Sequence, residues 1–147
     1  MRWLMPPRLF VACALSMIAL WRLLPLSALI GWPLTLAGLP LLLGGLGLSV
    51  AGSRRFASSG ANIQTFEEPT RLVADGLFRF SRNPMYLGFA AALFGLAVLL
   101  GALSPFAVAA GFVVIVDRWY IRFEERRMAA GFGAAYAAYR RQVRRWL

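Results

Sequence analysis

The 147-residue sequence predicts a single all-α integral membrane domain with about four transmembrane helices. Hydrophobic residues make up 60% of the chain and charged residues 15%, whereas soluble domains average roughly 45–50% and 25%. Two apolar blocks, residues 9–52 and 83–116, contain one charged side chain between them, Arg22. The remaining fifteen of the sixteen basic residues, all arginines, lie outside these blocks.

Helix-breaking residues divide each apolar block into two segments. Each block is about twice as long as a spanning helix, which needs roughly 20 residues. Pro25 to Ser27 interrupt the first block, and Gly101 to Pro105 interrupt the second. We therefore predict helices over residues 8–24, 28–52, 85–102 and 105–122. A cleaved signal peptide is the alternative for the first segment, but no small-residue cleavage site of the A-x-A kind follows it.

The arginines also predict the orientation of these helices. Residues 53–82 contain five arginines and the segment from Arg118 onward contains eight, whereas the turn near residues 101–105 contains none. Cytoplasmic loops of membrane proteins carry an excess of basic residues. This distribution predicts an integral membrane protein with both termini and the 53–82 loop cytoplasmic. An amphipathic helix is expected to follow the fourth crossing.

Composition excludes several kinds of site. The chain has no histidine, which excludes an imidazole base and a histidine-ligated zinc. Cys13 is its one cysteine, so no intramolecular disulfide or cysteine cluster can form. The net charge of +10 is compatible with nucleic-acid binding, but the arginines lie where membrane orientation also requires them. We predict no metal and no nucleic-acid partner.

Small residues within the predicted helices indicate close helix packing. Glycines allow helix backbones to approach each other in lipid. Those expected to do so are Gly31, Gly38, Gly44, Gly45, Gly47, Gly88 and Gly95.

Two polar motifs flank the last predicted hairpin. Residues 75–88 read DGLFRFSRNPMYLG, and Glu124-Glu125 is followed by Phe132-Gly133-x-x-Tyr136-x-x-Tyr139-Arg140. The first string resembles the G-x-[YF]-x-x-x-R-[NH]-P-x-Y-x-G signature of the isoprenylcysteine carboxyl methyltransferase family, and the second resembles that family's E-E…F-G-x-x-Y-x-x-Y signature. This family is related to the phospholipid N-methyltransferases. The resemblance covers roughly residues 60–146.

The resemblance implies a membrane enzyme that transfers a methyl group from S-adenosyl-L-methionine to a lipophilic acceptor. The chain is similar to small bacterial members, which implies a bacterial inner membrane. It divides the chain into two N-terminal helices, residues 1–52, and a cofactor-binding and catalytic part, residues 53–147. The implied cofactor-binding residues are Gln64, Thr70, Arg71, Leu72, Val73, Phe78, Arg82, Asn83, Pro84, Met85, Tyr86 and Glu124. Phe78 replaces a common tyrosine, and Asn83 replaces the histidine of many members.

The residue types suit the chemical groups of this cofactor. Its ammonium requires a carboxylate, which Glu124 would provide. Its carboxylate requires an arginine or backbone N–H groups, which Arg82 and the loop before Pro84 would provide. Aromatic and apolar side chains such as Phe78 and Tyr86 suit the adenine. Glu125 points roughly 100° away from Glu124 on a helix, so we expect it to be solvated or paired with an arginine.

Arg118 and Arg122 are the candidate catalytic residues, because one of them would orient an anionic acceptor beside the methyl group. The alternative is that both are interfacial arginines that reach the headgroups. Arg140, Arg141, Arg144 and Arg145 are expected to contact anionic headgroups.

Three other functions remain open. The acceptor could be the amine of a phospholipid. The chain could also be a non-catalytic membrane scaffold or lipid-binding protein. A sterol-type membrane reductase, which would use NADPH, is the third. The short chain and the Glu124-Glu125 pair favour the methyl donor.

Overall fold

A computed structural model describes residues 5–60 and 71–147, and in this part of the chain the regular structure is helical. The main helices are α1 (Pro6–Leu23), α2 (Gly38–Ser58), α3 (Pro84–Leu100), α4 (Leu103–Ile115) and α5 (Arg122–Gln142). Short 3₁₀ turns lie at η1 (Leu34–Ala37) and η2 (Gly76–Arg79), and the π-helical segment η3 (Val116–Ile121) joins α4 to α5. The predicted all-helical class is confirmed for the described residues.

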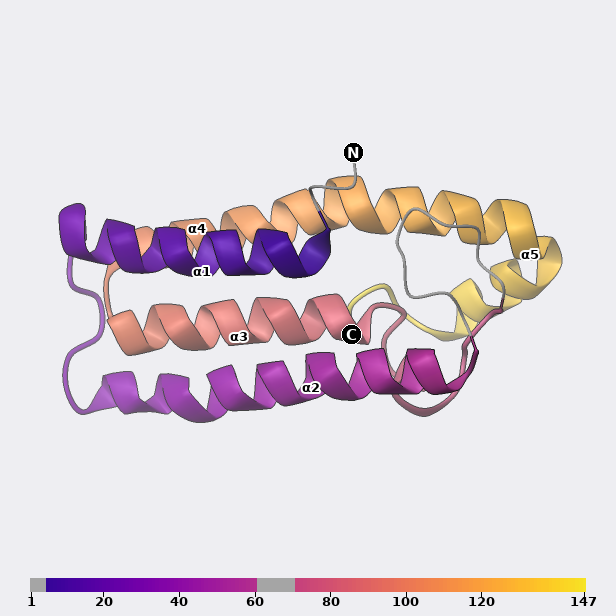
Figure 1. The fold of residues 1–147 in the computed structure, drawn as a ribbon, viewed down its shortest axis with the longest axis horizontal. Helices are drawn as coiled ribbons and strands as arrows, with labels where there is room; N and C mark the ends of the chain where they lie inside the picture. The colour runs from indigo at the N-terminus through magenta and orange to yellow at the C-terminus, as the bar shows by residue number, and fades with distance from the viewer. Residues whose placement is uncertain (1–4, 61–70) are drawn as a thin grey trace.

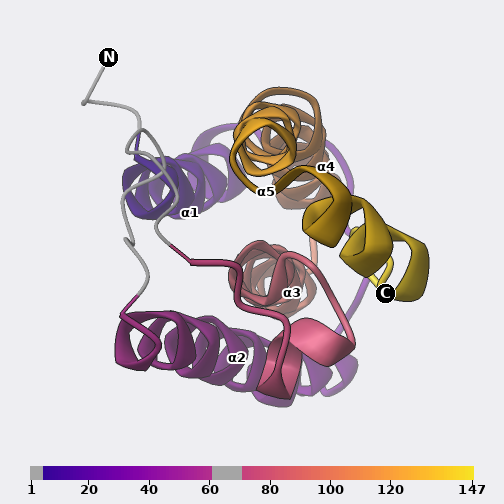
Figure 2. The ribbon, with the colours of Figure 1, turned by 90° about the vertical axis from the view of Figure 1, so that its right-hand side faces the viewer.

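The helices form an up-and-down bundle with α3 inside it. Helices α1 to α4 alternate in direction, and α5 extends α4 beyond one end of the bundle (Figure 1). Viewed along its length, the bundle has α3 between α2 on one side and α1 with α4 on the other (Figure 2). Among the residues that the structure describes, two helical segments are long and apolar enough to cross a membrane, Pro6–Leu23 and Leu34–Ser58. α3 is apolar and has 17 residues.

The first, third and fourth helices begin close to their predicted positions, whereas the second does not. The prediction of helix from residue 28 was wrong, because residues 27–30 pair with the turn between α3 and α4. The N–H groups of Leu29 and Ile30 donate to the carbonyl of Gly101, and that of Leu103 donates to Ser27. Gly101 ends α3 at φ +66°, a left-handed conformation that glycine adopts without strain.

Glycines bring α2 and α3 into backbone contact. A Cβ atom on Gly45 would lie 2.4 Å from the nitrogen of Ala92, and one on Gly88 would lie 2.5 Å from the nitrogen of Ser49. Gly38 and Gly95 approach each other in the same way one heptad away. The predicted close packing is therefore confirmed at these four glycines. It is wrong for Gly31, Gly44 and Gly47, where a Cβ would meet nothing within 4 Å.

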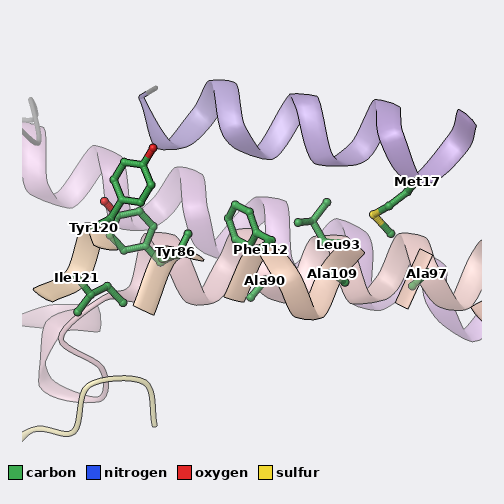
Figure 3. Packing of buried hydrophobic residues seen from close by; sticks show 10 residues of the cluster. Met17, Tyr86, Ala90, Leu93, Ala97, Ala109, Phe112, Tyr120 and Ile121 are labelled. Carbon is green, nitrogen blue, oxygen red and sulfur yellow. The ribbon is translucent and has the colours of Figure 1, made fainter. Parts of the chain in front are cut away.

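The buried core lies between α1, α3 and α4. Met17, Leu93 and Phe112 are fully buried there, and alanines at positions 90, 97 and 109 keep the helices close (Figure 3). At one end of this core Tyr86 and Tyr120 bring hydroxyl groups to the otherwise apolar cluster. The core thus becomes polar at the end from which α5 projects.

Candidate functional site

A cavity of about 310 Å³ opens at this end of the bundle, within the size range of small-molecule sites, roughly 300–1,000 Å³. Its walls come from the start of α1, the end of α2, the segment that precedes α3, the start of α3 and both halves of α5. The apolar wall includes Phe56, Phe78 and Phe89, and the charged wall includes Arg82, Glu124 and Glu125.

The start of α3 positions the first motif. Pro84 is the first residue of the helix, where its missing N–H breaks no helical bond and its fixed φ suits the helix. Asn83 immediately precedes it, and Tyr86 is buried in the first turn of α3. These constraints direct Asn83 and Tyr86 into the cavity wall.

The second motif reaches the same cavity because α5 reverses direction. Gly133 has φ +45° and ψ −118° inside α5, and the helix folds back at its far end (Figure 1). Tyr136 and Tyr139 follow this bend and line the cavity. The hydroxyl of Tyr139 donates to the carbonyl of Phe78 at 2.7 Å, so the bend returns to the first motif. Burial raises the pKa of both tyrosines.

The two neighbouring acids have different partners. Glu124 accepts a 2.7 Å hydrogen bond at Oε1 from the hydroxyl of Tyr86. Glu125 is buried and forms ion pairs with Arg82 at 2.9 Å and Arg145 at 2.6 Å. Both acids line the cavity. Glu125 is therefore paired with arginines, as one of the two alternatives predicted, but it lies inside the protein.

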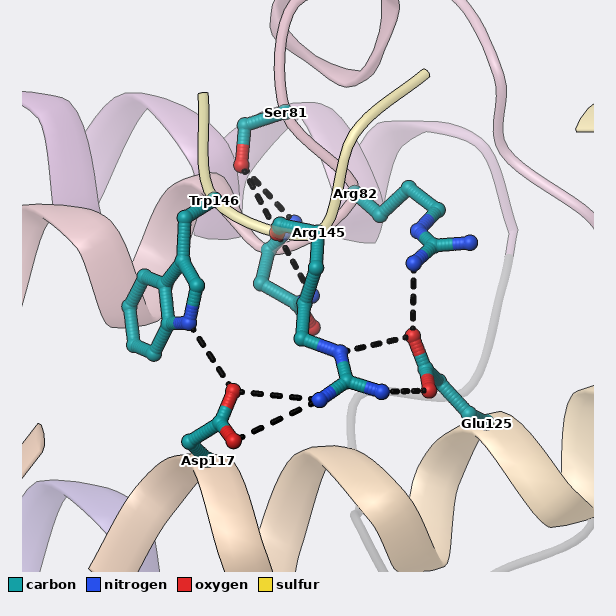
Figure 4. A network of polar contacts seen from close by, with 7 residues as sticks. Ser81, Arg82, Asp117, Glu125, Arg145 and Trp146 are labelled. Atoms are coloured by element: carbon teal, nitrogen blue, oxygen red, sulfur yellow. Dashed lines mark hydrogen bonds and ion pairs between the residues drawn. The ribbon is translucent and has the colours of Figure 1, made fainter. Parts of the chain in front are cut away.

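A polar network ties the segment after α5 to this wall (Figure 4). Arg145 bridges Glu125 and Asp117, and the indole N–H of Trp146 donates to Asp117 at 2.9 Å. The carbonyl of Arg145 accepts from the side-chain amide of Asn83 at 3.0 Å. Headgroup contact by Arg145 was therefore the wrong prediction, since its guanidinium is held by two internal carboxylates. The hydrogen bonds to Glu125 are the main reason that the pKa of the Arg145 guanidinium is raised above its ordinary value.

Comparison with known proteins identifies the family. The family model described as phospholipid methyltransferase matches residues 34–135, which include most of both motifs and of the cavity wall. The chain belongs to the phospholipid methyltransferase family. Neither a curated protein nor a solved structure matches the chain. The family match confirms the recognition made from the motifs, since the two methyltransferase families are related.

In this phospholipid methyltransferase family member, most of the predicted cofactor-binding residues lie together. Those in the cavity wall are Val73, Phe78, Arg82, Asn83, Met85, Tyr86 and Glu124. Pro84 is buried beside Gly52 rather than in the wall. Leu72 packs near Tyr136 and Tyr139, and Arg71 is exposed and donates to the carbonyl of Ser59. Gln64 and Thr70 lie outside the described residues.

The two candidate catalytic arginines lie apart from this group. Arg118 and Arg122 are exposed on η3 and the start of α5, and neither lines the cavity. Sequence reasoning missed Ser49, Ser53 and Phe56 of α2, which do line it. No residue pattern singles these three out, because their position depends on how closely α2 packs on α3. For Glu125, the sequence signal that could have indicated a buried position in the cavity wall is its place in the Glu124-Glu125 pair.

Proposed function

We propose that this phospholipid methyltransferase family member uses S-adenosyl-L-methionine to methylate a lipophilic acceptor within the membrane. The observation that supports this proposal best is the shared cavity, because residues of both motifs meet in one wall. Asn83 and Tyr86 come from the residue before α3 and from its first turn, and Glu124 and Tyr136 come from α5.

The residues of the cavity fit the groups of this cofactor. Glu124 would hold the ammonium, and Phe56, Phe78 and Tyr86 would provide surfaces for the adenine. Arg82 would hold the carboxylate. Its Nε is buried and makes no hydrogen bond to any residue that the structure describes, and such an unsatisfied donor is unfavourable unless a ligand uses it.

The proposed chemistry needs few protein groups. S-adenosyl-L-methionine supplies a methyl group on a sulfonium, which an anionic acceptor can attack without a general base. The protein would hold the acceptor in line and exclude water from the reacting atoms. A prenylcysteine-type carboxylate or another small lipophilic anion fits this scheme. Arg118 or Arg122 remains the proposed contact for such an anion, at the outer side of α5.

A phospholipid amine is the second acceptor class, and the family description favours it. An amine must lose a proton before it attacks. Glu125 is paired with Arg82 and Arg145. The carboxylate that would accept this proton is then Glu124, which has a neutral partner, Tyr86, in addition to its other contacts.

We also propose four membrane crossings with the cavity on the cytoplasmic side. α3 is about 26 Å long at 1.5 Å per residue, close to the roughly 30 Å of a hydrocarbon core. α4 and η3 form one continuous helical stretch from Leu103 to Ile121. The arginine-rich segments then lie at the same end of the bundle as the cavity.

Calorimetry on detergent-purified protein tests the proposal, with S-adenosylhomocysteine, S-adenosylmethionine and NADPH as separate ligands. We expect the first two to bind and NADPH to give no signal. Binding of NADPH alone would indicate the reductase, and binding of none would favour a scaffold or lipid-binding protein. A methylation assay with a prenylcysteine analogue beside an aminophospholipid then separates the two acceptor classes.

A further inference from the structure

Arg145 is not one of the residues that line the cavity, yet its side chain contacts two carboxylates, that of Glu125 in the cavity wall and that of Asp117. Its Nε donates to Glu125 Oε1 at 3.2 Å and its Nη2 donates to Oε2 at 2.6 Å. This is the bidentate arrangement in which arginine binds a carboxylate most strongly. The remaining terminal nitrogen contacts Asp117 at 3.2 and 3.3 Å.

The bidentate contact changes what Arg82 can do. Arg82 reaches Glu125 through Nη2 alone, at 2.9 Å. Its other terminal nitrogen points away from Glu125 (Figure 4), and its Nε has no hydrogen-bond partner among the described residues. The Arg82 side chain is 9% exposed, so water does not readily satisfy the buried Nε.

Charge explains why Arg145 matters for this arrangement. Glu125 is 10% exposed, and a buried carboxylate requires a cationic partner. Arg82 is the other ion-pair partner of Glu125 among the described residues, so without Arg145 we expect Arg82 to form the bidentate pair itself. Its donors would then be directed at Glu125 instead of the cavity.

The backbone holds Arg145 at this position. The carbonyl of Arg144 accepts from the N–H of Arg82 at 3.0 Å. The carbonyl of Arg145 accepts from Asn83, and Trp146 binds Asp117. These contacts join residues 144–146 to the loop that precedes α3 and to η3, so Asn83 supports Arg145 as well as lining the cavity.

We propose that Arg145 is a positioning residue that occupies Glu125 and thereby keeps the guanidinium of Arg82 open to an anionic group of the ligand. The identity of that group, the carboxylate of the methyl donor, rests on the proposed function. Arg145 itself contacts only protein groups in this role.

Paired ligands separate positioning from a purely structural role. S-adenosylhomocysteine carries the carboxylate, and 5′-methylthioadenosine retains the adenosine and sulfur but lacks the amino-acid part. We expect Arg145→Ala to reduce S-adenosylhomocysteine affinity about tenfold or more, the loss of one charge-assisted contact. Affinity for 5′-methylthioadenosine should remain within about twofold. Arg145→Lys should restore part of the loss, because lysine supplies the charge without the bidentate geometry.

Two further variants control the experiment. Arg144→Ala removes an exposed neighbouring arginine and should leave both affinities unchanged. In a Glu125→Gln background a neutral amide replaces the carboxylate, so Arg145→Ala should have a much smaller effect on affinity than in the wild-type chain. Equal loss of both ligands, or an equal effect of Arg145→Ala in the two backgrounds, would overturn the proposal.

The same variants distinguish this proposal from the proposed function. If the wild-type chain binds neither ligand, the proposed function fails. Thermal unfolding then still decides whether Arg145 and Glu125 are coupled, because effects of contacting residues do not add. Additive shifts in the unfolding midpoint for the two single variants and the double variant would overturn the role of Arg145 independently of any ligand.

Discussion

The hydroxyl of Tyr86 donates a 2.7 Å hydrogen bond to Oε1 of Glu124, across 38 residues of sequence. Tyr86 belongs to the Arg-Asn-Pro motif at the start of α3, and Glu124 belongs to the acid pair at the start of α5. The bond therefore joins the two motifs directly. It also fixes the direction of a carboxylate that the proposed function assigns to the ammonium of the donor.

Glu124→Gln should reduce donor affinity much more than Tyr86→Phe. Loss of a contact with a charged group costs about 1.5–3 kcal/mol, or roughly ten- to a hundredfold in affinity. Tyr86→Phe keeps the charge of Glu124 and removes one neutral donor, so a loss of about tenfold or less is expected. Calorimetry with S-adenosylhomocysteine measures both. Unchanged affinity in Glu124→Gln would remove this residue from the donor site.

Tyr139→Phe should destabilise the bundle and change its response to alkaline pH. The substitution leaves the carbonyl of Phe78 without its 2.7 Å donor, which costs about 1–3 kcal/mol when the group is buried. Burial, the main cause, raises the pKa of Tyr139 above the ordinary value of about 10. This contribution to stability is complete below about pH 10 and is lost as the pH rises through the folded-state pKa.

Thermal unfolding in detergent at pH 7 and at increasing alkaline pH measures both effects. The wild-type chain should lose more stability above about pH 10 than Tyr139→Phe does. An equal loss of stability at alkaline pH in the two proteins would contradict our inference that ionisation of Tyr139 causes it.

The sequence predicts the helices where a single residue type decides the outcome. Pro25 and Gly101 mark real chain reversals, because proline lacks a backbone donor and Gly101 adopts a left-handed conformation. The apolar run from residue 28 does contain a helix breaker, Pro33, immediately before η1, but the sequence does not reveal what holds residues 28–30 out of a helix. Their backbone groups pair with the turn at Gly101, and that partner is remote in sequence.

The site shows the same division. Motif residues next to Pro84, such as Asn83 and Tyr86, lie where local geometry places them. Arg145 looks like one more arginine of a basic tail, because its partners, Glu125 and Asp117, are 20 and 28 residues away. Only the return of the chain after Gly133 brings them together.

Gly45→Ala should destabilise the protein, whereas Gly44→Ala should not. A Cβ on Gly45 would lie 2.4 Å from the nitrogen of Ala92 and 2.6 Å from the carbonyl oxygen of Gly88. The backbones of α2 and α3 would have to separate, and such overpacking costs about 1–3 kcal/mol. Gly44 faces open space, so alanine there should stabilise the helix by up to about 1 kcal/mol. Thermal unfolding compares the pair, and equal behaviour would contradict the α2–α3 contact.

Arg118→Ala and Arg122→Ala should leave donor affinity within about twofold of the wild-type value, as expected for exposed positions. If one of them orients an anionic acceptor, that variant alone should lose turnover with a prenylcysteine analogue. Calorimetry and the methylation assay on the same preparations separate the two effects. A loss of donor affinity in either variant would mean that the arginine reaches the cavity after all.

The final prediction concerns orientation in the membrane. Ser58 ends α2 at the cavity end of the bundle, and Ser27 lies at the opposite end, where its carbonyl accepts from Leu103. Both side chains are exposed, whereas Ser104 is buried and would label poorly.

After replacement of Cys13, a cysteine at position 58 should react with an impermeant maleimide only when the cytoplasmic face is accessible. A cysteine at position 27 should react from the outside of intact cells. Labelling of both positions from one side would exclude the four-crossing arrangement, because an odd number of crossings must separate Ser27 from Ser58.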